Sequence, residues 1–211
     1  MLKRMSVYAA LSLLLLLTSI SYGASLQVVM LGDSLTEGLG VMQEDAFPAL
    51  VQEKFEKDGL QVQLMNAGVS GSTSASGPRR LKWYVKIKPD LVFLALGAND
   101  GLRGLSLEEM KQNLAKTIEA CQRNSLKVVL AGMHVPPNYG EAYSTEFHQV
   151  FHDLASKYKI PLLPFLLEGV AGDPDLNQPD GIHPNEEGQK KVAKLVYEFL
   201  KPVVKEHLDA R

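Results

Sequence analysis

A serine, an aspartate and a histidine in this 211-residue sequence have the residue types of a hydrolytic triad: Ser34, Asp180 and His183. A serine hydroxyl is a poor nucleophile at neutral pH until a base removes its proton, and that base needs an acceptor that orients it. Gly181 permits a tight turn in which the Asp180 carboxylate reaches Nδ1 of His183, so that Nε2 is left for the serine. The same residues also suit an ordinary turn before a helix, so the run alone leaves both interpretations open.

Hydrogen-bond donors for a developing oxyanion are a second requirement of acyl transfer. Gly71 could present its backbone N–H closely because it has no side chain, Asn99 could add its side-chain NH2, and Ser34 its own N–H. Each has an ordinary alternative, since Gly71 could serve a loop and Asn99 could cap a turn. The prediction depends on convergence, because independent turns have no reason to supply a complete set.

Apolar residues accompany these polar groups in the same segments. They are Leu35, Leu102, Val135 and Pro136. Apolar side chains beside a reactive serine favour an acyl chain over a sugar as the bound group. We therefore predict that these four residues contact the substrate.

Other catalytic motifs fit less well. A nucleophile elbow needs glycine two places after the serine, but Thr36 stands there. The run GDSLTEGLG matches neither of the common phosphate-binding glycine patterns, so nucleotide binding is not expected. His148 and His152 lie one helical turn apart, yet Gln149 replaces the glutamate of a zinc-protease motif, which favours a half-exposed helical face over a metal site. We expect no metal and no organic cofactor.

The composition is that of a folded, mildly acidic protein. Apolar residues make up 45% of the chain, which excludes intrinsic disorder, and 22 basic residues against 24 acidic ones argue against nucleic-acid binding. The single cysteine, Cys121, cannot form an internal disulfide or a cysteine-rich metal site. It lies on an apolar helical stripe with Met110, Leu114 and Ile118, so we predict a core position rather than a nucleophile.

The elements that would position these residues alternate along the chain. Short runs rich in Val, Leu and Ile predict strands at 27–31, 62–65, 91–96, 128–131 and 160–163. Helical spacing of apolar residues predicts helices around 47–55, 106–121, 147–158 and 192–203, with Ser106 and Glu109 forming a capping box. The alternation predicts an α/β fold, a three-layer α/β/α sandwich with a five-stranded parallel sheet. The candidate residues then follow strand ends and share one rim.

The first residues have the features of a secretory signal. Lys3 and Arg4 precede an apolar run from Val7 to Leu17, and small residues follow it. We predict a signal peptide over 1–23 and one hydrolase domain over 24–211. The apolar run is shorter than a membrane span, so we expect no stable membrane insertion after cleavage. The mature protein is expected to be an exported monomer, periplasmic or secreted.

Four blocks in order give the sequence a resemblance to a known family: GDSLTEG around Ser34, NAGVSG ending at Gly71, GAND with Asn99, and DGIHP with Asp180 and His183. Together they resemble the SGNH, or GDSL, hydrolases over almost the whole mature chain. GANDGLRG and PPNYG further resemble the exported bacterial thioesterase I, lysophospholipase and arylesterase branch. The resemblance implies a flavodoxin-like fold and the same triad and oxyanion donors.

The expected activity is therefore hydrolysis of carboxylic esters or thioesters through an acyl-enzyme, with a small-molecule ester or lipid as the partner. Aryl esters, medium-chain acyl esters, acyl thioesters and lysophospholipids are the candidate substrates. Because acyl-CoA is chiefly cytosolic, export favours lipid or aryl esters. Two alternatives stay open at this point. One is a carbohydrate O-acetylesterase of the same family, and the other is an inactive lipid- or glycan-binding module.

Overall fold

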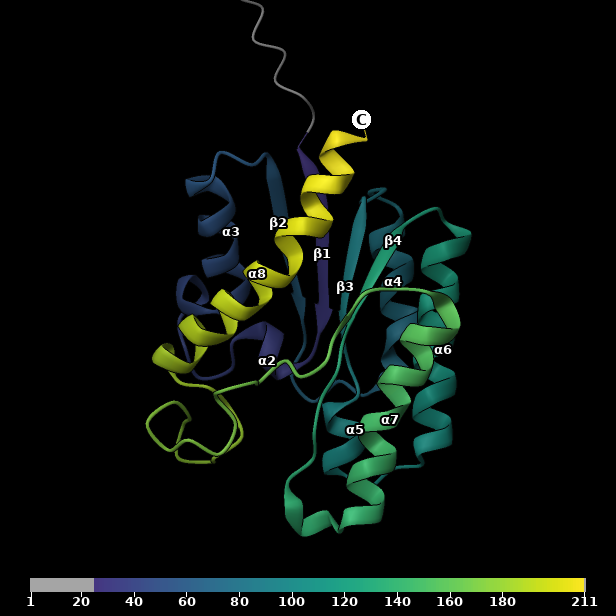
Figure 1. Ribbon diagram of the computed structural model, residues 1–211, viewed down its shortest axis with the longest axis vertical. Helices are drawn as coiled ribbons and strands as arrows, with labels where there is room; N and C mark the ends of the chain where they lie inside the picture. Colours follow the sequence, from purple (N-terminus) through teal and green to yellow (C-terminus); the bar gives the residue numbers. More distant parts are fainter. Residues whose placement is uncertain (1–24, 211) are drawn as a thin grey trace, which may run out of the picture.

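Residues 25–210 of the chain, described by a computed structural model, form a five-stranded parallel β-sheet covered by helices on both faces (Figure 1). The strands are β1 (Leu26–Gly32), β2 (Val62–Gly68), β3 (Leu91–Ala95), β4 (Lys127–Ala131) and β5 (Leu162–Leu163), in the order β2-β1-β3-β4-β5. The helices are α2 (Ser34–Glu37), α3 (Phe47–Lys57), α4 (Gly77–Val85), α5 (Ala98–Leu102), α6 (Leu107–Arg123), α7 (Glu141–Tyr158) and α8 (Glu186–Asp209). Single turns of 3₁₀ helix occur at η1 (Gln43–Asp45), η2 (Ser74–Ser76) and η3 (Pro137–Tyr139).

The central strands are buried on both sides. All five residues of β3 are buried, and β1 has one residue that is not fully buried, Gln27. Strand β1 pairs with both β2 and β3, so that Val28 faces Leu64 on one side and Leu91 on the other. A strand that is covered on both faces needs a continuous apolar run, which is the pattern found here.

The helices form two layers on opposite faces of the sheet. Helices α3 and α8 pack together on one face, and α4, α6 and α7 pack in sequence on the other (Figure 1). The three-layer α/β/α sandwich with a five-stranded parallel sheet is therefore confirmed. The strand order is that of a flavodoxin-like sheet.

The core contains the helical stripes that the sequence predicts. Phe47 and Phe55 of α3 are fully buried, as are Leu114 and Cys121 of α6. Cys121 is thus a core residue, as predicted, and burial raises the pKa of its thiol to about 12. The capping interaction at the start of α6 is also present, because the Glu109 backbone N–H donates to Ser106 Oγ at 3.2 Å.

Strand and helix boundaries depart from the predictions in several places. Helices α7 and α8 each begin six residues before the predicted start, and the short helices α2 and α5 were not predicted. Strand β5 is confined to two residues, because Pro161 has no N–H for the ladder and contributes only its carbonyl, which accepts from Leu130 at 2.9 Å. Strand β2 continues beyond Met65 to Gly68, paired with the end of β1. Helix α4 was not expected from the sequence. Gly77 and Leu81 are its only buried residues, so it offers few core positions that a sequence pattern could reveal.

The carboxyl ends of the strands meet at one rim of the sheet, where α2 and α5 lie and where the chain enters α8 (Figure 1). Gly68 at the end of β2 permits a close approach there, because a Cβ at this position would lie 2.1 Å from the backbone nitrogen of Glu37. The four-residue helix α2 can therefore rest directly on the end of β2.

The predicted signal peptide over 1–23 lies outside the described residues. Within 25–210, no helix is both long and apolar enough to cross a membrane.

Candidate active site

The serine, histidine and aspartate of the predicted triad lie in contact at the rim of the sheet. Ser34 Oγ lies 2.9 Å from His183 Nε2, although the two residues are 149 positions apart in the sequence. His183 Nδ1 lies 2.7 Å from Asp180 Oδ2. The imidazole thus has one nitrogen toward the hydroxyl and the other toward the carboxylate, which is the arrangement that a general base requires.

The Asp180 carboxylate also organises the turn that carries the histidine. Its Oδ1 accepts the backbone N–H groups of Ile182 at 3.0 Å and of His183 at 3.1 Å. Burial alone would raise the pKa of Asp180, but these hydrogen bonds and the one to the imidazole outweigh it, so the pKa lies below its usual value of 3.8. Gly181 in this turn has φ +74°, a left-handed conformation that glycine adopts without strain. The run therefore forms the predicted turn, and in the same conformation it holds the imidazole of His183 toward Ser34.

Ser34 opens a helix of a single turn. Asp33 precedes it as the N-cap and its Oδ1 accepts the backbone N–H of Leu35 at 3.1 Å. Gly38 ends the helix in the left-handed conformation at φ +83°. The serine is therefore held by a capped turn between β1 and the end of β2.

Asp33 is a functional-site residue that the sequence analysis missed. It is 2% exposed, and burial raises the pKa of its carboxyl from 3.8 to about 6, against the lowering effect of hydrogen bonds from Leu35 and Asn99. The residue stands next to the serine, and an aspartate before a helical turn is a recognisable N-cap. That signal could have identified its capping role, whereas its burial is a property of the fold.

The predicted oxyanion donors lie on the neighbouring loops. Asn99 Nδ2 donates to the carbonyl of Ser72 at 3.1 Å and approaches Asp33 Oδ2 at 3.4 Å. Gly71 has φ +74°, and its carbonyl accepts from Arg103 at 3.1 Å. Among the backbone hydrogen bonds of residues 25–210, none is donated by the Gly71 N–H. The structure thus holds the Asn99 amide between Asp33, which caps α2, and the loop of Gly71.

Two further sets of hydrogen bonds hold the loops that carry Gly71, Asn99 and Ser34 in place. Ser74 donates from its backbone N–H to Asp100 Oδ2 at 2.8 Å and from its hydroxyl to Oδ1 at 2.6 Å, and both residues are buried. The Arg80 guanidinium donates to the carbonyl of Gly32 at 2.8 Å and to that of Ala67. It therefore ties the ends of β1 and β2 together beneath Ser34.

The four apolar residues predicted to contact substrate differ in their surroundings. Leu35 and Val135 are buried in the hydrophobic core, 7% and 8% exposed. Leu102 and Pro136 are half-buried, and the Leu102 carbonyl accepts from Tyr139 Oη at 2.6 Å. Leu102 and Pro136 are accordingly more accessible to a bound acyl group than the other two.

Three of the four histidines outside the triad form a cluster on the side of β4 and α7. His148 and His152 are half-buried, as predicted, with their Nε2 atoms 2.9 Å apart, and the exposed His134 stacks on His148 with ring centroids 4.0 Å apart. Burial lowers the pKa of both His134 and His148. Across residues 25–210, no group of three or more His, Cys, Asp or Glu side chains is arranged to hold a metal ion.

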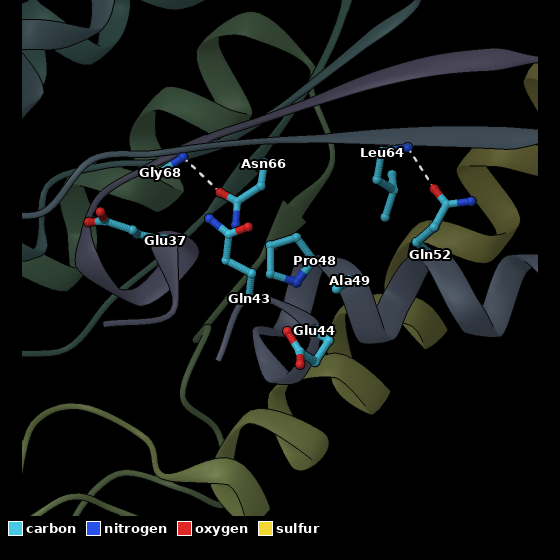
Figure 2. A pocket seen from close by; sticks show the side chains of 9 residues that line it. All are labelled: Glu37, Gln43, Glu44, Pro48, Ala49, Gln52, Leu64, Asn66 and Gly68. Carbon is cyan, nitrogen blue, oxygen red and sulfur yellow. Dashed lines mark hydrogen bonds between the residues drawn. The ribbon is translucent and has the colours of Figure 1, made fainter. Parts of the chain in front are cut away.

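A hollow of about 580 Å³ lies beside the rim, between α3 and the outer edge of β2 (Figure 2). The side chains of Gln52 and Asn66 there bond to backbone N–H groups of β2, Leu64 at 2.8 Å and Gly68 at 2.9 Å. Its lining includes Glu37 but none of the triad residues. We therefore do not assign the reaction to this hollow.

Comparison with known proteins gives consistent matches over nearly the whole chain. Residues 30–191 match the model of the GDSL-like Lipase/Acylhydrolase family. "Esterase TesA" of Pseudomonas aeruginosa is 39% identical over 192 residues, which cover 90% of this chain and 94% of that protein. "Thioesterase 1/protease 1/lysophospholipase L1" of Escherichia coli K12 is 34% identical, covering 91% of each chain. The crystal structure of the psychrotrophic esterase EstA from Pseudoalteromonas sp., inhibited by monoethylphosphonate, superposes with a TM-score of 0.81 at 33% identity, covering 85% of this chain and 98% of that one.

The buried Asp33 carboxylate generates a prediction about stability. The pKa of Asp33 is raised in the folded state. Its contribution to the free energy of unfolding is therefore most favourable below about pH 4 and is lost as the pH rises from about 4 to about 6. A shift from 3.8 to about 6 corresponds to a penalty of up to about 3 kcal/mol at alkaline pH. Asp33→Asn keeps an acceptor for the Leu35 N–H and removes the charge, so it should raise the free energy of unfolding at about pH 8 and change it less at about pH 4.

Urea unfolding of the wild-type and Asp33→Asn proteins at the two pH values measures this difference. The matched control is Glu37→Gln, because Glu37 lies on the same short helix but is exposed. An equal effect of Asp33→Asn at both pH values would show that its charge is not the source of the penalty.

Proposed function

Since the chain belongs to the GDSL-like lipase/acylhydrolase family and is an ester-hydrolysing serine enzyme, we propose that Ser34 is its nucleophile, His183 its general base and Asp180 the residue that orients the base. The observation that carries the proposal is the 2.9 Å separation of Ser34 Oγ and His183 Nε2, together with the 2.7 Å contact of His183 Nδ1 and Asp180. The resemblance of the four sequence blocks to this family agrees with the comparisons.

The first half of the reaction forms an acyl-enzyme. Ser34 Oγ attacks the carbonyl carbon of the ester while His183 Nε2 takes the hydroxyl proton. The new C–O bond places a negative charge on the former carbonyl oxygen. The C–O bond to the alcohol then breaks, and the imidazolium returns its proton to the leaving oxygen. Asp180 keeps the proton on Nδ1 throughout and stabilises the imidazolium.

The second half repeats these steps with water. His183 removes a proton from a water molecule that attacks the acyl carbon, and the proton then passes to Ser34 Oγ as the acid is released. The negative oxygen in both halves is held by the backbone N–H groups of Ser34 and Gly71 and by Asn99 Nδ2. Because the Asn99 amide contacts Ser72 and Asp33 in the free protein, the substrate oxygen must share or replace the Ser72 contact.

We further propose that the enzyme is exported and acts on lipid or aryl esters as a monomer, with 1–23 removed as a signal peptide and 24–211 as the hydrolase domain. The sequence features of the first residues support export. Leu102, three residues after Asn99, and Pro136 in the loop after β4 are half-buried and support an acyl group as the bound part of the substrate, whereas Leu35 and Val135 are buried in the core. The lysophospholipase and thioesterase named among the relatives also act on acyl groups.

Labelling by a fluorophosphonate probe tests the nucleophile. The wild-type chain should be labelled, and Ser34→Ala should lose both labelling and nearly all turnover, keeping at most the roughly 10³-fold advantage over water that binding and oxyanion donors can supply. Ser70→Ala, a nearby exposed serine bonded to Glu37, is the control and should be labelled normally. Labelling of the Ser34→Ala protein would assign the nucleophile elsewhere.

Asp180→Asn tests the orienting role. The amide reverses the hydrogen-bond polarity at His183 Nδ1, so kcat should fall by about 10² to 10⁴. The smaller losses in this range apply if water, which reaches the half-exposed side chain of residue 180, partly replaces the carboxylate. KM for a p-nitrophenyl ester should change little. Asp175→Asn, an exposed neighbour in the same loop, should leave both constants unchanged. Equal kcat values for the two variants would contradict the role of Asp180.

A series of p-nitrophenyl esters from about two to about sixteen carbons tests the substrate class. Each additional buried methylene contributes about 0.8 kcal/mol of transfer free energy, so kcat/KM should rise with chain length until the apolar site is filled. A broad optimum at medium length is expected for a lipid esterase. A sharp preference for acetate would instead favour the carbohydrate O-acetylesterase.

A further inference from the structure

Helix α4 and the turn after it have a charge unlike the rest of the chain. Five basic residues occur within ten positions, namely Arg79, Arg80, Lys82, Lys86 and Lys88. No acidic residue occurs anywhere from position 59 to position 89, although the whole chain has 24 of them and a net charge of −2. A mildly acidic protein thus carries one strongly basic segment.

The spacing of these residues places most of the charge on one side of the helix. Arg79, Lys82, Trp83 and Lys86 follow each other at intervals of three, one and three, which aligns them along one helical face. All four are exposed, whereas Leu81 between them is buried against the sheet. Arg80 points inward as well, since it bonds to the carbonyls of β1 and β2.

Large apolar side chains lie among these charges. Trp83 is the single tryptophan of the chain and is 69% exposed, and Ile87 in the following turn is 49% exposed. The Lys86 ammonium group lies 4.5 Å from the centre of the Trp83 ring, a cation–π distance. We call the set of Arg79, Lys82, Trp83, Lys86, Ile87 and Lys88 the basic face.

The charges of the basic face have no acidic partners. None of the ion pairs in the part of the chain that the structure describes includes Arg79, Lys82, Lys86 or Lys88. Helix α8 on the opposite layer shows the contrast, because Lys190 pairs with Glu187 and Lys194 with Glu198. The basic face is therefore a surface whose charge is free to attract an anionic partner.

We propose that the basic face docks the enzyme on a phospholipid bilayer that contains anionic lipids. Lysine and arginine at the level of the headgroups attract anionic lipid, while tryptophan and isoleucine enter the boundary between headgroups and acyl chains. Tryptophan is enriched at that depth because its ring is apolar and its N–H is polar. An acidic protein would also match the charge, and binding to an acidic polypeptide is one of the outcomes tested below.

The position of α4 suits an enzyme that uses lipid at such a surface. The helix begins at the rim, where Gly77 lies against Leu96, the residue after β3. It rises about 1.5 Å per residue, so Trp83 lies only about 9 Å along the helix axis from this start. From its start the helix leads away from the rim toward the start of β3, so Arg79 lies nearest the candidate active site and Lys88 farthest from it. Docking is a property of α4 and does not require the proposed catalytic residues.

Vesicle binding by the chain carrying Ser34→Ala tests the proposal without hydrolysis. With vesicles of equal parts phosphatidylcholine and phosphatidylglycerol, the protein should co-sediment and the emission of Trp83 should shift to shorter wavelength. With phosphatidylcholine alone, or in high salt, both signals should be lost because surface charge attraction is screened. Because Trp83 is the single tryptophan, the shift reports directly on the basic face.

Variants that remove charges distinguish vesicle binding through the basic face from nonspecific electrostatic attraction. The triple change of Lys82, Lys86 and Lys88 to Gln should weaken vesicle binding about 100-fold, because each charge contributes about a factor of five. The matched control changes the three exposed α8 lysines Lys191, Lys194 and Lys205 to Gln and should bind as the parent does. Trp83→Ala, read by sedimentation and checked for unchanged thermal unfolding, should also bind more weakly.

Three results would overturn the proposal. They are a Trp83 emission that does not change with anionic vesicles, an equal loss of binding in both triple-lysine variants, and binding to an acidic polypeptide or an oligonucleotide but not to vesicles. Failure of the esterase proposal is distinguishable from all of these. Vesicle binding is measured on the Ser34→Ala chain, whereas the esterase proposal is decided by the labelling of wild-type Ser34.

Discussion

The contact between Ser34 Oγ and His183 Nε2 is the constraint that the topology of this chain has to satisfy, because it joins residues 149 positions apart. A parallel sheet meets it, since every strand ends at the same rim and the helices return the chain to the other end each time. Strand β1 lies in the interior of the sheet, and α8 packs beside α3 on one face. The segment that precedes α8 and carries His183 therefore reaches the carboxyl end of β1, where Ser34 follows. Ser34 and His183 are thus brought together by the fold rather than by local sequence.

Charge is distributed around this contact in a way that the reaction can use. The half-exposed Asp180 accepts three hydrogen bonds and keeps a low pKa, so it is available to balance a positively charged imidazole. The buried Asp33, one residue before the nucleophile, has a raised pKa because water is excluded from it. The two carboxyl groups near one histidine therefore have different pKa values, raised by burial at Asp33 and lowered by hydrogen bonds at Asp180.

Sequence reasoning predicts most of the fold because β1 and β3 are buried on both faces and so appear as continuous apolar runs. It also finds Ser34, Asp180 and His183, whose residue types and spacing carry chemical meaning. It does not find α4, because that helix is short and buries only Gly77 and Leu81. Burial of Asp33 and of Leu35 depends on contacts between distant strands and loops, which a single sequence does not specify.

Helix α2 has only four residues, held by the Asp33 cap, the left-handed Gly38 and the end of β2 at Gly68. One turn of helix has almost no cooperative stability of its own, so its order depends on these three attachments. On warming, such a turn opens locally before the sheet and the long helices melt. The Ser34 hydroxyl would then lose its alignment while the core is still intact, so we expect heat inactivation to precede global unfolding and to reverse on cooling.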